Sequence, residues 1–235
     1  MAQRTITLVS ARMLSRDVRE LTFEPTPPLP FEPGQWVSVK IPRADGSLLA
    51  RSYSIASAPR ADGRFDLAVT RVEGGEGSGW LHAARIGDSL AVSDAAGFFT
   101  LPEDASPPLL MVATGTGVAP LRAMIQRLFD GTITPPRVTL LLGARTEADV
   151  IYGDEFRALA SRAGGFRFER TLSRPDERTV GRTGYVQLHL AELVADLGAC
   201  EAYVCGLNAM VREVRATLKD ALGFTRERIH TERYD

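Results

Sequence analysis

Length, composition and charge already exclude several classes of protein. The chain has 235 residues, which suits two domains of roughly 100 to 130 residues better than one. Its net charge is -1, with 44% hydrophobic and 24% charged residues, so it has no basic excess to attract nucleic acid or anionic lipid. We therefore expect an ordinary globular protein with no nucleic-acid partner.

Targeting signals and metal-binding patterns are also missing from the sequence. No run approaches the length of about eighteen apolar residues that a membrane span needs, and residues 1–6 alternate in polarity instead of forming a signal-type apolar block. We expect a cytoplasmic protein without membrane insertion. The two cysteines, Cys200 and Cys205, are too few for an iron-sulfur cluster or a structural zinc site, and the three histidines show no metal spacing. We expect no metal.

The first hundred residues are rich in predicted strands. Apolar residues repeat there with period two, in runs bounded by Gly, Pro or Asp, at Val37, Val39 and Ile41, at Phe65, Leu67 and Val69, and at Leu90 and Val92. This pattern predicts a small β-barrel over residues 1–102. A block of turn residues and prolines then breaks both helix and strand, so we place a linker at residues 103–108.

Residues 109–235 have the pattern of an α/β domain. Continuous apolar runs at 109–113 and 138–142 are typical of strands buried on both faces of a parallel sheet. Amphipathic segments lie between and after such runs, with apolar residues on one helical face at Leu121, Met124, Ile125 and Leu128, and again at Met210, Val214 and Leu218. Alternating strands and helices predict an open parallel sheet.

The first turn of this second domain is a candidate phosphate site. The apolar strand runs through Thr114-Gly115-Thr116-Gly117 into a helix that we expect to begin at Pro120, where a missing N–H costs nothing. Two glycines let the backbone approach a pyrophosphate, and the helix end adds partial positive charge. A tight connection without a ligand is the alternative.

Two segments of the first domain are candidates for a second anion site. Arg51-Ser52-Tyr53-Ser54 lies on a predicted strand, so Arg51 and Tyr53 share a face and suit a planar ligand that bears phosphate. An ordinary surface strand is the alternative. The glycine-rich segment 74–79 precedes a helix start at which Ser78 can cap and meet a phosphate, unless it is only a mobile hairpin loop.

Four motifs together resemble the ferredoxin-NADP reductase family. They occur in the family's order, on both sides of the proline linker, as Arg51-x-Tyr53-Ser54, the Gly77-Ser78 loop, Gly115-Thr116-Gly117-Val118-Ala119-Pro120 and Cys205-Gly206-Leu207-Asn208-Ala209-Met210. The resemblance spans nearly the whole chain. It implies an N-terminal antiparallel Greek-key β-barrel that binds flavin, most simply FAD, and a C-terminal Rossmann-like α/β domain that binds NADH or NADPH.

The resemblance also implies roles for single residues. Arg51 would hold the flavin phosphates, Tyr53 would contact the flavin, and Ser54 would approach the flavin N5 atom. The other cofactor-binding candidates are Ser52, Val69, Arg71, Gly77, Ser78, Gly115, Thr116, Gly117, Arg145, Ser173, Arg174, Cys205, Gly206 and Tyr234. The candidate catalytic residues are Ser54, Cys205 and Glu232.

Two questions stay open at the coenzyme end. Arg145 follows a buried strand where a basic residue can meet the 2'-phosphate of NADP, and Ser173-Arg174 resembles another such contact, so NADPH is slightly favoured over NADH. The family often ends in an aromatic residue over the flavin. This chain ends in Asp235, so Tyr234 either stacks on the ring or anchors a fraying tail.

The residues and the resemblance together predict a flavin-dependent NAD(P)H reductase. Hydride transfer needs positioning and exclusion of water more than strong acids or bases, and a flavin can release electrons singly to a ferredoxin, a flavodoxin or an oxygenase component. Because the chain carries no cysteine cluster, the acceptor would be a separate protein. The alternatives are an electron-transfer subunit of a larger enzyme and a flavin- or nucleotide-binding module without turnover.

Overall fold

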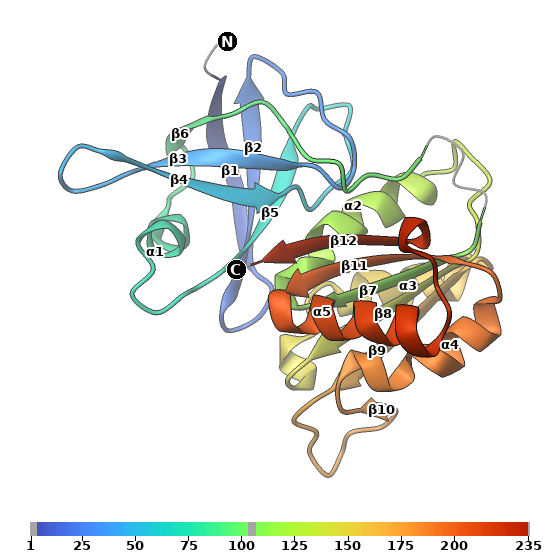
Figure 1. Ribbon diagram of the computed structural model, residues 1–235. Coiled ribbons are helices and arrows are strands. Elements are labelled where there is room, and N and C mark those ends of the chain that lie inside the picture. The colour runs from blue at the N-terminus through green and yellow to red at the C-terminus, as the bar shows by residue number, and fades with distance from the viewer. Residues whose placement is uncertain (1–3, 103–106, 235) are drawn as a thin grey trace. The chain divides into compact units, whose positions relative to one another are not determined.

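The chain divides into two compact units in a computed structural model that describes residues 4–102 and 107–234 (Figure 1). The first unit takes in the described residues up to Leu101 together with Arg122–Arg127. The second takes in the described residues of Pro102–Leu121 and those from Leu128 onward. Most of the predicted linker, residues 103–106, lies outside the described residues.

The first unit is an antiparallel barrel. Its strands are β1 (Arg4–Met13), β2 (Val18–Thr26), β3 (Trp36–Pro42), β4 (Leu48–Ser54), β5 (Phe65–Thr70) and β6 (Ser89–Val92). Their order in the sheet is β4-β3-β6-β1-β2-β5, and every neighbouring pair is antiparallel. A further antiparallel bridge between Ile55 and Leu67 joins the chain after β4 to β5 and closes the sheet. This confirms the predicted Greek-key barrel.

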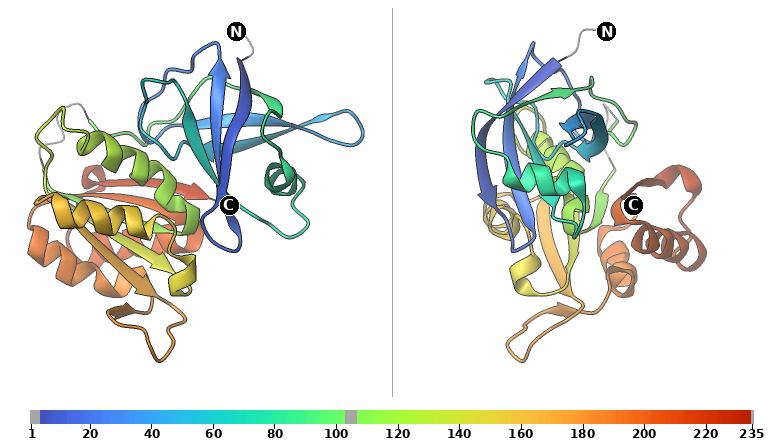
Figure 2. Two further views of the ribbon diagram at one scale, coloured as in Figure 1. Left: turned by 180° about the vertical axis from the view of Figure 1, so that it is seen from behind. Right: turned by 90° about the vertical axis from the view of Figure 1, so that its left-hand side faces the viewer.

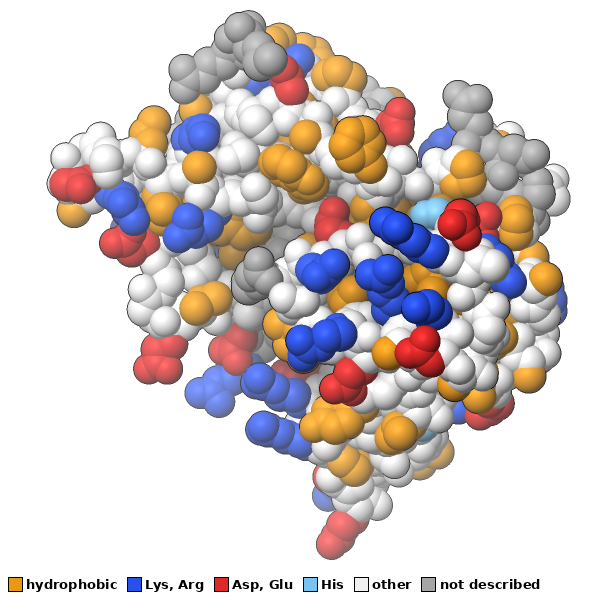
Figure 3. Space-filling view, in the orientation of Figure 1, with side chains coloured by type: hydrophobic (Ala, Val, Ile, Leu, Met, Phe, Trp, Pro, Cys, Tyr) orange, Lys and Arg blue, Asp and Glu red, His pale blue; other side chains and the backbone are white. Residues whose placement is uncertain are grey.

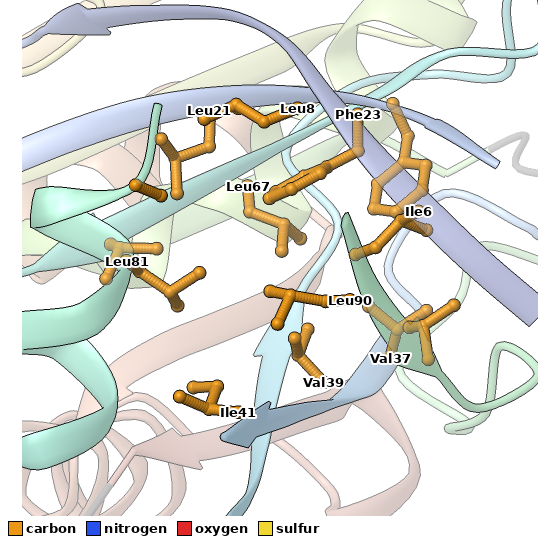
Figure 4. Packing of buried hydrophobic residues seen from close by; sticks show 14 of the residues in the cluster. Ile6, Leu8, Leu21, Phe23, Val37, Val39, Ile41, Leu67, Leu81 and Leu90 are labelled. Carbon is orange, nitrogen blue, oxygen red and sulfur yellow. The ribbon is translucent and has the colours of Figure 1, made fainter. Parts of the chain in front are cut away.

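Alternation of apolar residues along the strands fills the barrel interior. The side chains that Figure 4 labels point into one shared core, and all are nearly or completely buried: Ile6, Leu8, Leu21, Phe23, Val37, Val39, Ile41, Leu67, Leu81 and Leu90. Successive strand residues face opposite sides, so the period of two seen in the sequence places one side of each strand in this core. Leu81 comes from the helix α1 (Glu76–Ala83), which is thereby fixed against the strands.

A buried group of charges also belongs to the first unit. Glu20 of β2, Asp66 of β5 and Arg122 are each less than 8% exposed. Arg122 Nη1 donates to the Ala56 carbonyl oxygen at 2.8 Å and to Asp66 Oδ2 at 3.3 Å, and it lies 3.6 Å from Glu20 Oε2. Burying a charge is costly unless it is paired and hydrogen-bonded. Arg122 therefore compensates both buried carboxylates, together with Arg12, which pairs with Glu20 at 2.6 Å, and Arg60, which pairs with Asp66 at 3.0 Å.

The second unit is built on a parallel sheet. Its strands are β7 (Leu109–Thr114), β8 (Val138–Ala144), β9 (Phe166–Leu172), β10 (Arg182–Thr183), β11 (Glu201–Leu207) and β12 (Ile229–Tyr234), in the order β10-β9-β8-β7-β11-β12. The helices are α2 (Val118–Leu128), α3 (Gly153–Arg162), α4 (Leu190–Leu197) and α5 (Asn208–Ala216). Helices α4 and α5 lie in front of the sheet in Figure 1, and α3 lies in front of it when the view is reversed in Figure 2. The predicted open α/β sheet is confirmed.

The start of α2 differs from the expectation. The helix begins at Val118, after a 3-10 turn over Gly115–Gly117, so Pro120 is its third residue and not its first. The reason is that N–H groups in the first turn have no intrahelical acceptor, so proline is tolerated over several positions there. The predicted apolar face is confirmed, because Leu121, Met124, Ile125 and Leu128 are all at most 2% exposed.

None of the helices in residues 4–102 and 107–234 is long and apolar enough to span a bilayer.

Removing Arg122 should destabilise the first unit. Asp66 and Glu20 would stay buried but lose their shared partner, so we expect Arg122→Ala to cost roughly 3 kcal/mol of unfolding free energy. Both tryptophans, Trp36 in β3 and Trp80 in α1, belong to the first unit, so urea unfolding followed by tryptophan fluorescence reports on it. The exposed Arg162→Ala is the control. Equal unfolding midpoints for the two variants would contradict the role of Arg122.

Candidate functional site

The structure brings two predicted segments of the first unit together. Arg51 lies on β4, and Gly77 lies in the first turn of α1. A Cβ added to Gly77 would lie only 3.1 Å from Arg51 Cγ and 3.3 Å from Ile41 Cδ1. The first turn of α1 therefore packs on the stem of Arg51, and only a glycine fits there without displacing it.

The charged end of Arg51 remains available. The side chain is exposed, its Nη1 donates a 2.9 Å hydrogen bond to the adjacent Ala50 carbonyl oxygen, and it forms no ion pair with any described residue. The first N–H groups of α1 also have no acceptor within the helix. A guanidinium beside free helix amides is an arrangement that suits a phosphate.

Ser78 does not cap the helix as expected. Helix α1 begins at Glu76, with Gly75 at the cap position and no side-chain cap bond. Ser78 Oγ instead accepts a hydrogen bond from the Val72 N–H at 3.0 Å and donates one to the Gly75 carbonyl oxygen at 3.3 Å. The chain enters the helix three residues earlier than the sequence indicated, so the Ser78 hydroxyl fixes the shape of the glycine-rich loop instead of capping the helix.

The remaining candidates of the first unit differ in exposure. Ser52 is exposed, Ser54 is buried opposite Trp36, and Tyr53 is half-buried against the barrel core, so burial raises the pKa of its phenol while Arg51 lowers it. Arg71 is exposed just beyond β5. Val69 is only 1% exposed, so its side chain belongs to the core and offers no surface to a ligand.

The second unit has a crevice position set by its topology. In the sheet, β7 has β8 as its neighbour on one side and β11 as its neighbour on the other, so the strand order reverses direction at β7. In parallel sheets ligands bind outside the carboxyl ends of the strands at such a reversal. The Gly115–Gly117 turn follows β7, and Cys205-Gly206 ends β11, so both predicted coenzyme segments flank this position.

Close packing at the reversal depends on Gly117. A Cβ there would overlap the Cys205 carbonyl oxygen and would lie 2.6 Å from Gly206 Cα. The neighbouring Gly115 has a φ of +53°, a conformation that side chains disfavour. Backbone from two strand ends thus meets with no side chain between.

Thr114 is a site residue that the sequence reasoning missed. It is the last residue of β7, and its side chain lies between two glycines. A Cβ added to Gly143 would lie 2.9 Å from Thr114 Cγ2, and a Cβ added to Gly206 would lie 2.6 Å from Thr114 Oγ1. Its Oγ1 is buried and has no hydrogen-bond partner among the described residues. A buried hydroxyl without a partner is costly, so this atom fits a coenzyme that supplies one. The repeated Thr-Gly of residues 114–117 was the signal that could have found it.

Three predicted residues meet at the end of the sheet. Strand β12 runs parallel to β11 and places Glu232 opposite Cys205, with 4.0 Å between Glu232 Oε1 and Cys205 Sγ. Burial raises the pKa of the Cys205 thiol well above its ordinary value and the Glu232 charge raises it further, while a side-chain hydrogen bond with Tyr234 lowers it. Cys205 is therefore a neutral thiol at physiological pH. The tail is a paired strand up to Tyr234, and Asp235 lies outside the described residues.

The predicted 2'-phosphate residues also come together. The Arg174 N–H donates to the Arg145 carbonyl oxygen at 2.8 Å, and the Ser173 N–H donates to the Ala144 carbonyl oxygen at 3.0 Å. Both arginine side chains are exposed, and neither forms an ion pair with a described residue. Tyr185, which is 66% exposed and follows Gly184, adds an aromatic surface after the adjoining strand β10. Sequence reasoning did not single out this ring.

Metal-binding side chains do not gather in the described part of the chain. In residues 4–102 and 107–234 no group of three or more His, Cys, Asp and Glu is placed to hold a metal ion. Both cysteines are buried and free. The candidate binding residues thus lie in two places, around Arg51 and the start of α1 in the first unit and around the carboxyl ends of β7 and β11 in the second.

Comparison with known proteins matches each unit separately. The family profile described as "Oxidoreductase FAD-binding domain" matches residues 5–100, and the one described as "Oxidoreductase NAD-binding domain" matches residues 111–216. The first profile therefore covers the barrel with Arg51 and Gly77, and the second covers the crevice with Gly115–Gly117 and Cys205.

Similar whole proteins are reductases. The chain is 45% identical over 97% of its length to "Ferredoxin--NADP reductase B" of Sorangium cellulosum, of which it covers 96%. It is 32% identical over 93% of its length to "Glycine betaine monooxygenase reductase subunit" of Chromohalobacter salexigens, of which it covers 60%. Among solved structures, Amycolatopsis cytochrome P450 reductase GcoB matches with a TM-score of 0.86 and 30% identity over 99% of this chain and 69% of that one.

Replacing Thr114 by valine should change stability and coenzyme binding in opposite directions. Valine keeps the shape and removes a buried hydroxyl that lacks a partner, so we expect a higher Tm together with roughly tenfold weaker NAD(P)H binding. Differential scanning fluorimetry and coenzyme titration measure the two effects.

Thr171→Val is the matched control for stability. Thr171 is fully buried, and its Oγ1 donates to the Gly184 carbonyl oxygen at 2.9 Å, so valine should lower the Tm there. If Thr114→Val lowers the Tm as Thr171→Val does and leaves coenzyme binding unchanged, the Thr114 hydroxyl has a partner inside the protein and no role in the site.

Proposed function

The chain belongs to the ferredoxin-NADP reductase family of FAD-dependent NAD(P)H oxidoreductases, and we propose that it passes electrons from NAD(P)H through FAD to a separate ferredoxin or oxygenase component. One observation carries the proposal: each unit exposes arginines that have no ion-pair partner among the described residues, Arg51 beside the first turn of α1 and Arg145 with Arg174 after the strands β8 and β9. When bound, the flavin accepts a hydride and releases electrons singly.

We assign flavin binding to residues 1–102. Arg51 and the first turn of α1 would hold the phosphates, since a guanidinium pairs with phosphate oxygens in a fixed geometry. The half-buried Tyr53 would pack against the ring or the ribityl chain. The buried Ser54, next along β4, would approach N5 and keep water from it.

We assign coenzyme binding to residues 109–235. Gly115, Thr116 and Gly117 would cradle the pyrophosphate, and Cys205-Gly206 would line the nicotinamide pocket with Glu232 and Tyr234. None of these residues has to act as a strong base. The neutral Cys205 thiol offers a small, polarisable surface, and the paired strand β12 holds the carboxylate and the phenol in place beside it. The protein thus contributes orientation and exclusion of water.

A reductase subunit of an oxygenase is the second candidate function. It is supported by the 32% identity to the reductase subunit of a glycine betaine monooxygenase. The chain spans 60% of the length of that relative, so the remaining part of that protein has no counterpart in this chain. The two candidates share the same flow of electrons and differ in the acceptor.

Anaerobic reduction tests the proposal directly. The protein reconstituted with FAD should show a flavin absorption band that NADPH or NADH bleaches within seconds, and a one-electron acceptor should restore the band. A bound flavin that neither coenzyme bleaches would support a binding module without turnover instead.

Arg51→Ala should weaken flavin retention while leaving the coenzyme site intact. The loss of a charge-assisted phosphate contact should raise the Kd for FAD by roughly ten- to hundredfold. Gel filtration with absorbance detection measures retention, and titration with 2',5'-ADP measures the coenzyme site. Arg43→Ala is the control, because Arg43 lies near the same helix start but already pairs with Glu76 at 2.7 Å. Equal losses of both ligands in Arg51→Ala would contradict the assignment.

We infer a preference for NADPH from Arg145 and Arg174. The two exposed arginines meet through a backbone hydrogen bond, and a 2'-phosphate is the dianion that would engage both. Arg174→Ala should lower kcat/KM for NADPH roughly tenfold and leave kcat/KM for NADH nearly unchanged. Steady-state kinetics with both coenzymes measure the ratio. An equal loss with NADH would place Arg174 on a part of the nucleotide that both coenzymes share.

A further inference from the structure

Unpaired basic side chains gather in a third place besides the two assigned anion sites. Many arginines of the described chain are neutralised, as Arg64 is by Glu24 at 2.7 Å and Arg182 by Glu192 at 2.7 Å. The exposed arginines at the flavin and coenzyme sites are not. A third group consists of Arg212, Arg215 and Lys219, which are exposed and form no ion pair with a described residue. We call these three residues the α5 stripe.

The stripe follows one side of a helix. Its members are spaced by three and four residues along α5 and the π-helical turn Thr217–Ala221 that continues it, so they share one face. The adjacent face packs on the sheet through Val211, Val214 and Leu218, which are at most 1% exposed. The nearby Glu213 carboxylate accepts a hydrogen bond from Gln187 Nε2 at 2.5 Å, so it is directed toward Gln187 and not to the stripe.

A further arginine extends the stripe toward the carboxyl end of the sheet. In the β11–β12 register, Arg233 lies opposite Gly206 and Ile229 opposite Ala202. Ala202 and Ile229 pack in the core beneath α4 and α5, so by alternation Arg233 stands on the same side of the sheet as α5. Figure 3 shows Lys and Arg side chains gathered over the part of the second unit where α5 and β12 lie.

We propose that the α5 stripe is the docking face for a carboxylate-rich surface of the protein that accepts the electrons. The proposal rests on the proposed reductase function, which requires such a partner. The positive charge of the α5 stripe complements an acidic surface. Leu207, the residue directly before α5, is 63% exposed and adds an apolar contact next to the charges.

The dimensions of the stripe favour a protein over a small anion. Seven residues of helix cover about 10 Å, which is too wide for one phosphate to bridge. Complexes between electron-transfer proteins are small and short-lived, and their rate of formation depends on electrostatic steering by exposed charges such as these.

The position of the stripe suits electron exit. Helix α5 starts directly after the end of β11, where Cys205-Gly206 would line the nicotinamide pocket. Hydride transfer requires the flavin to reach that pocket. A partner bound at α5 would therefore lie beside the strand end that is assigned to the nicotinamide pocket.

The experiment compares two triple variants with the wild-type holoenzyme. The first is Arg212→Gln, Arg215→Gln and Lys219→Gln together. The second, with the same loss of charge elsewhere, is Arg16→Gln, Arg85→Gln and Arg162→Gln, all of which are exposed. A plant-type [2Fe-2S] ferredoxin coupled to cytochrome c serves as the acidic acceptor, and menadione serves as a neutral acceptor. Rates are measured over a range of NaCl concentrations.

The stripe variant should lose about tenfold or more in kcat/KM for the ferredoxin at low salt, and its salt dependence should be weaker than that of the wild type. Its menadione rate should stay within about twofold of the wild type, and the control variant should keep most of its ferredoxin rate.

Several outcomes overturn the docking face. These are a control variant that loses as much as the stripe variant, an unchanged ferredoxin rate in the stripe variant, and a wild type that reduces menadione but not the ferredoxin. A flavin that NAD(P)H does not bleach is a different result, because it removes the reductase function itself.

Discussion

The second unit depends on backbone atoms that approach one another more closely than any side chain allows. At the end of β7, Gly117 lies against the Cys205 carbonyl, and Thr114 fits between Gly143 and Gly206 of the neighbouring strands. This packing keeps the carboxyl ends of three strands level and free of bulky side chains. The Gly115–Gly117 turn, the start of α2 and the Cys205 end of β11 all take their positions from it, so the crevice is a consequence of missing Cβ atoms.

Some arginines of the chain form buried ion pairs within the fold, and others are exposed without an ion-pair partner among the described residues. In the barrel, Arg122 is buried between Glu20 and Asp66, where it stabilises carboxylates that the fold has removed from water. Arg51 and Arg174 remain exposed without a carboxylate partner among the described residues. A guanidinium already engaged by a carboxylate has to break that pair before it can bind a phosphate. The total charge of the chain, which is only -1, does not reveal this difference between paired and unpaired arginines.

Most of the fold could be predicted because it follows from periodicity. The alternation at Val37 to Ile41 and the continuous apolar run at 138–142 each specify how many faces of a strand are buried, and this distinguishes a barrel from a parallel sheet. Details at the ends of elements could not be predicted. Ser78 fixes a loop and does not cap α1, because the conformation of Val72 to Gly75 decides where the helix starts.

Candidate site residues could be predicted only where the residue type itself indicates the role, independently of its neighbours in the fold. The glycines of a strand-to-helix turn make residues 114–117 a candidate phosphate site by their type alone, but the unpartnered hydroxyl of Thr114 depends on which strands flank β7. The burial of Arg122 could not be predicted either, because nothing in the sequence distinguishes it from other arginines of predicted helices. Long-range neighbours decide both cases, and a single sequence does not record them.

Strand β12 makes the last residues a part of the sheet. A tail that ends in charged and aromatic residues would normally fray, yet Ile229–Tyr234 pairs along its whole length with β11. Burial raises the pKa of the Cys205 thiol, and because the pairing fixes Glu232 opposite Cys205, the carboxylate raises this pKa further. A neutral thiol is a weak nucleophile and resists oxidation. The edge strand thus helps to keep Cys205 in its neutral form near the carboxyl end of β11.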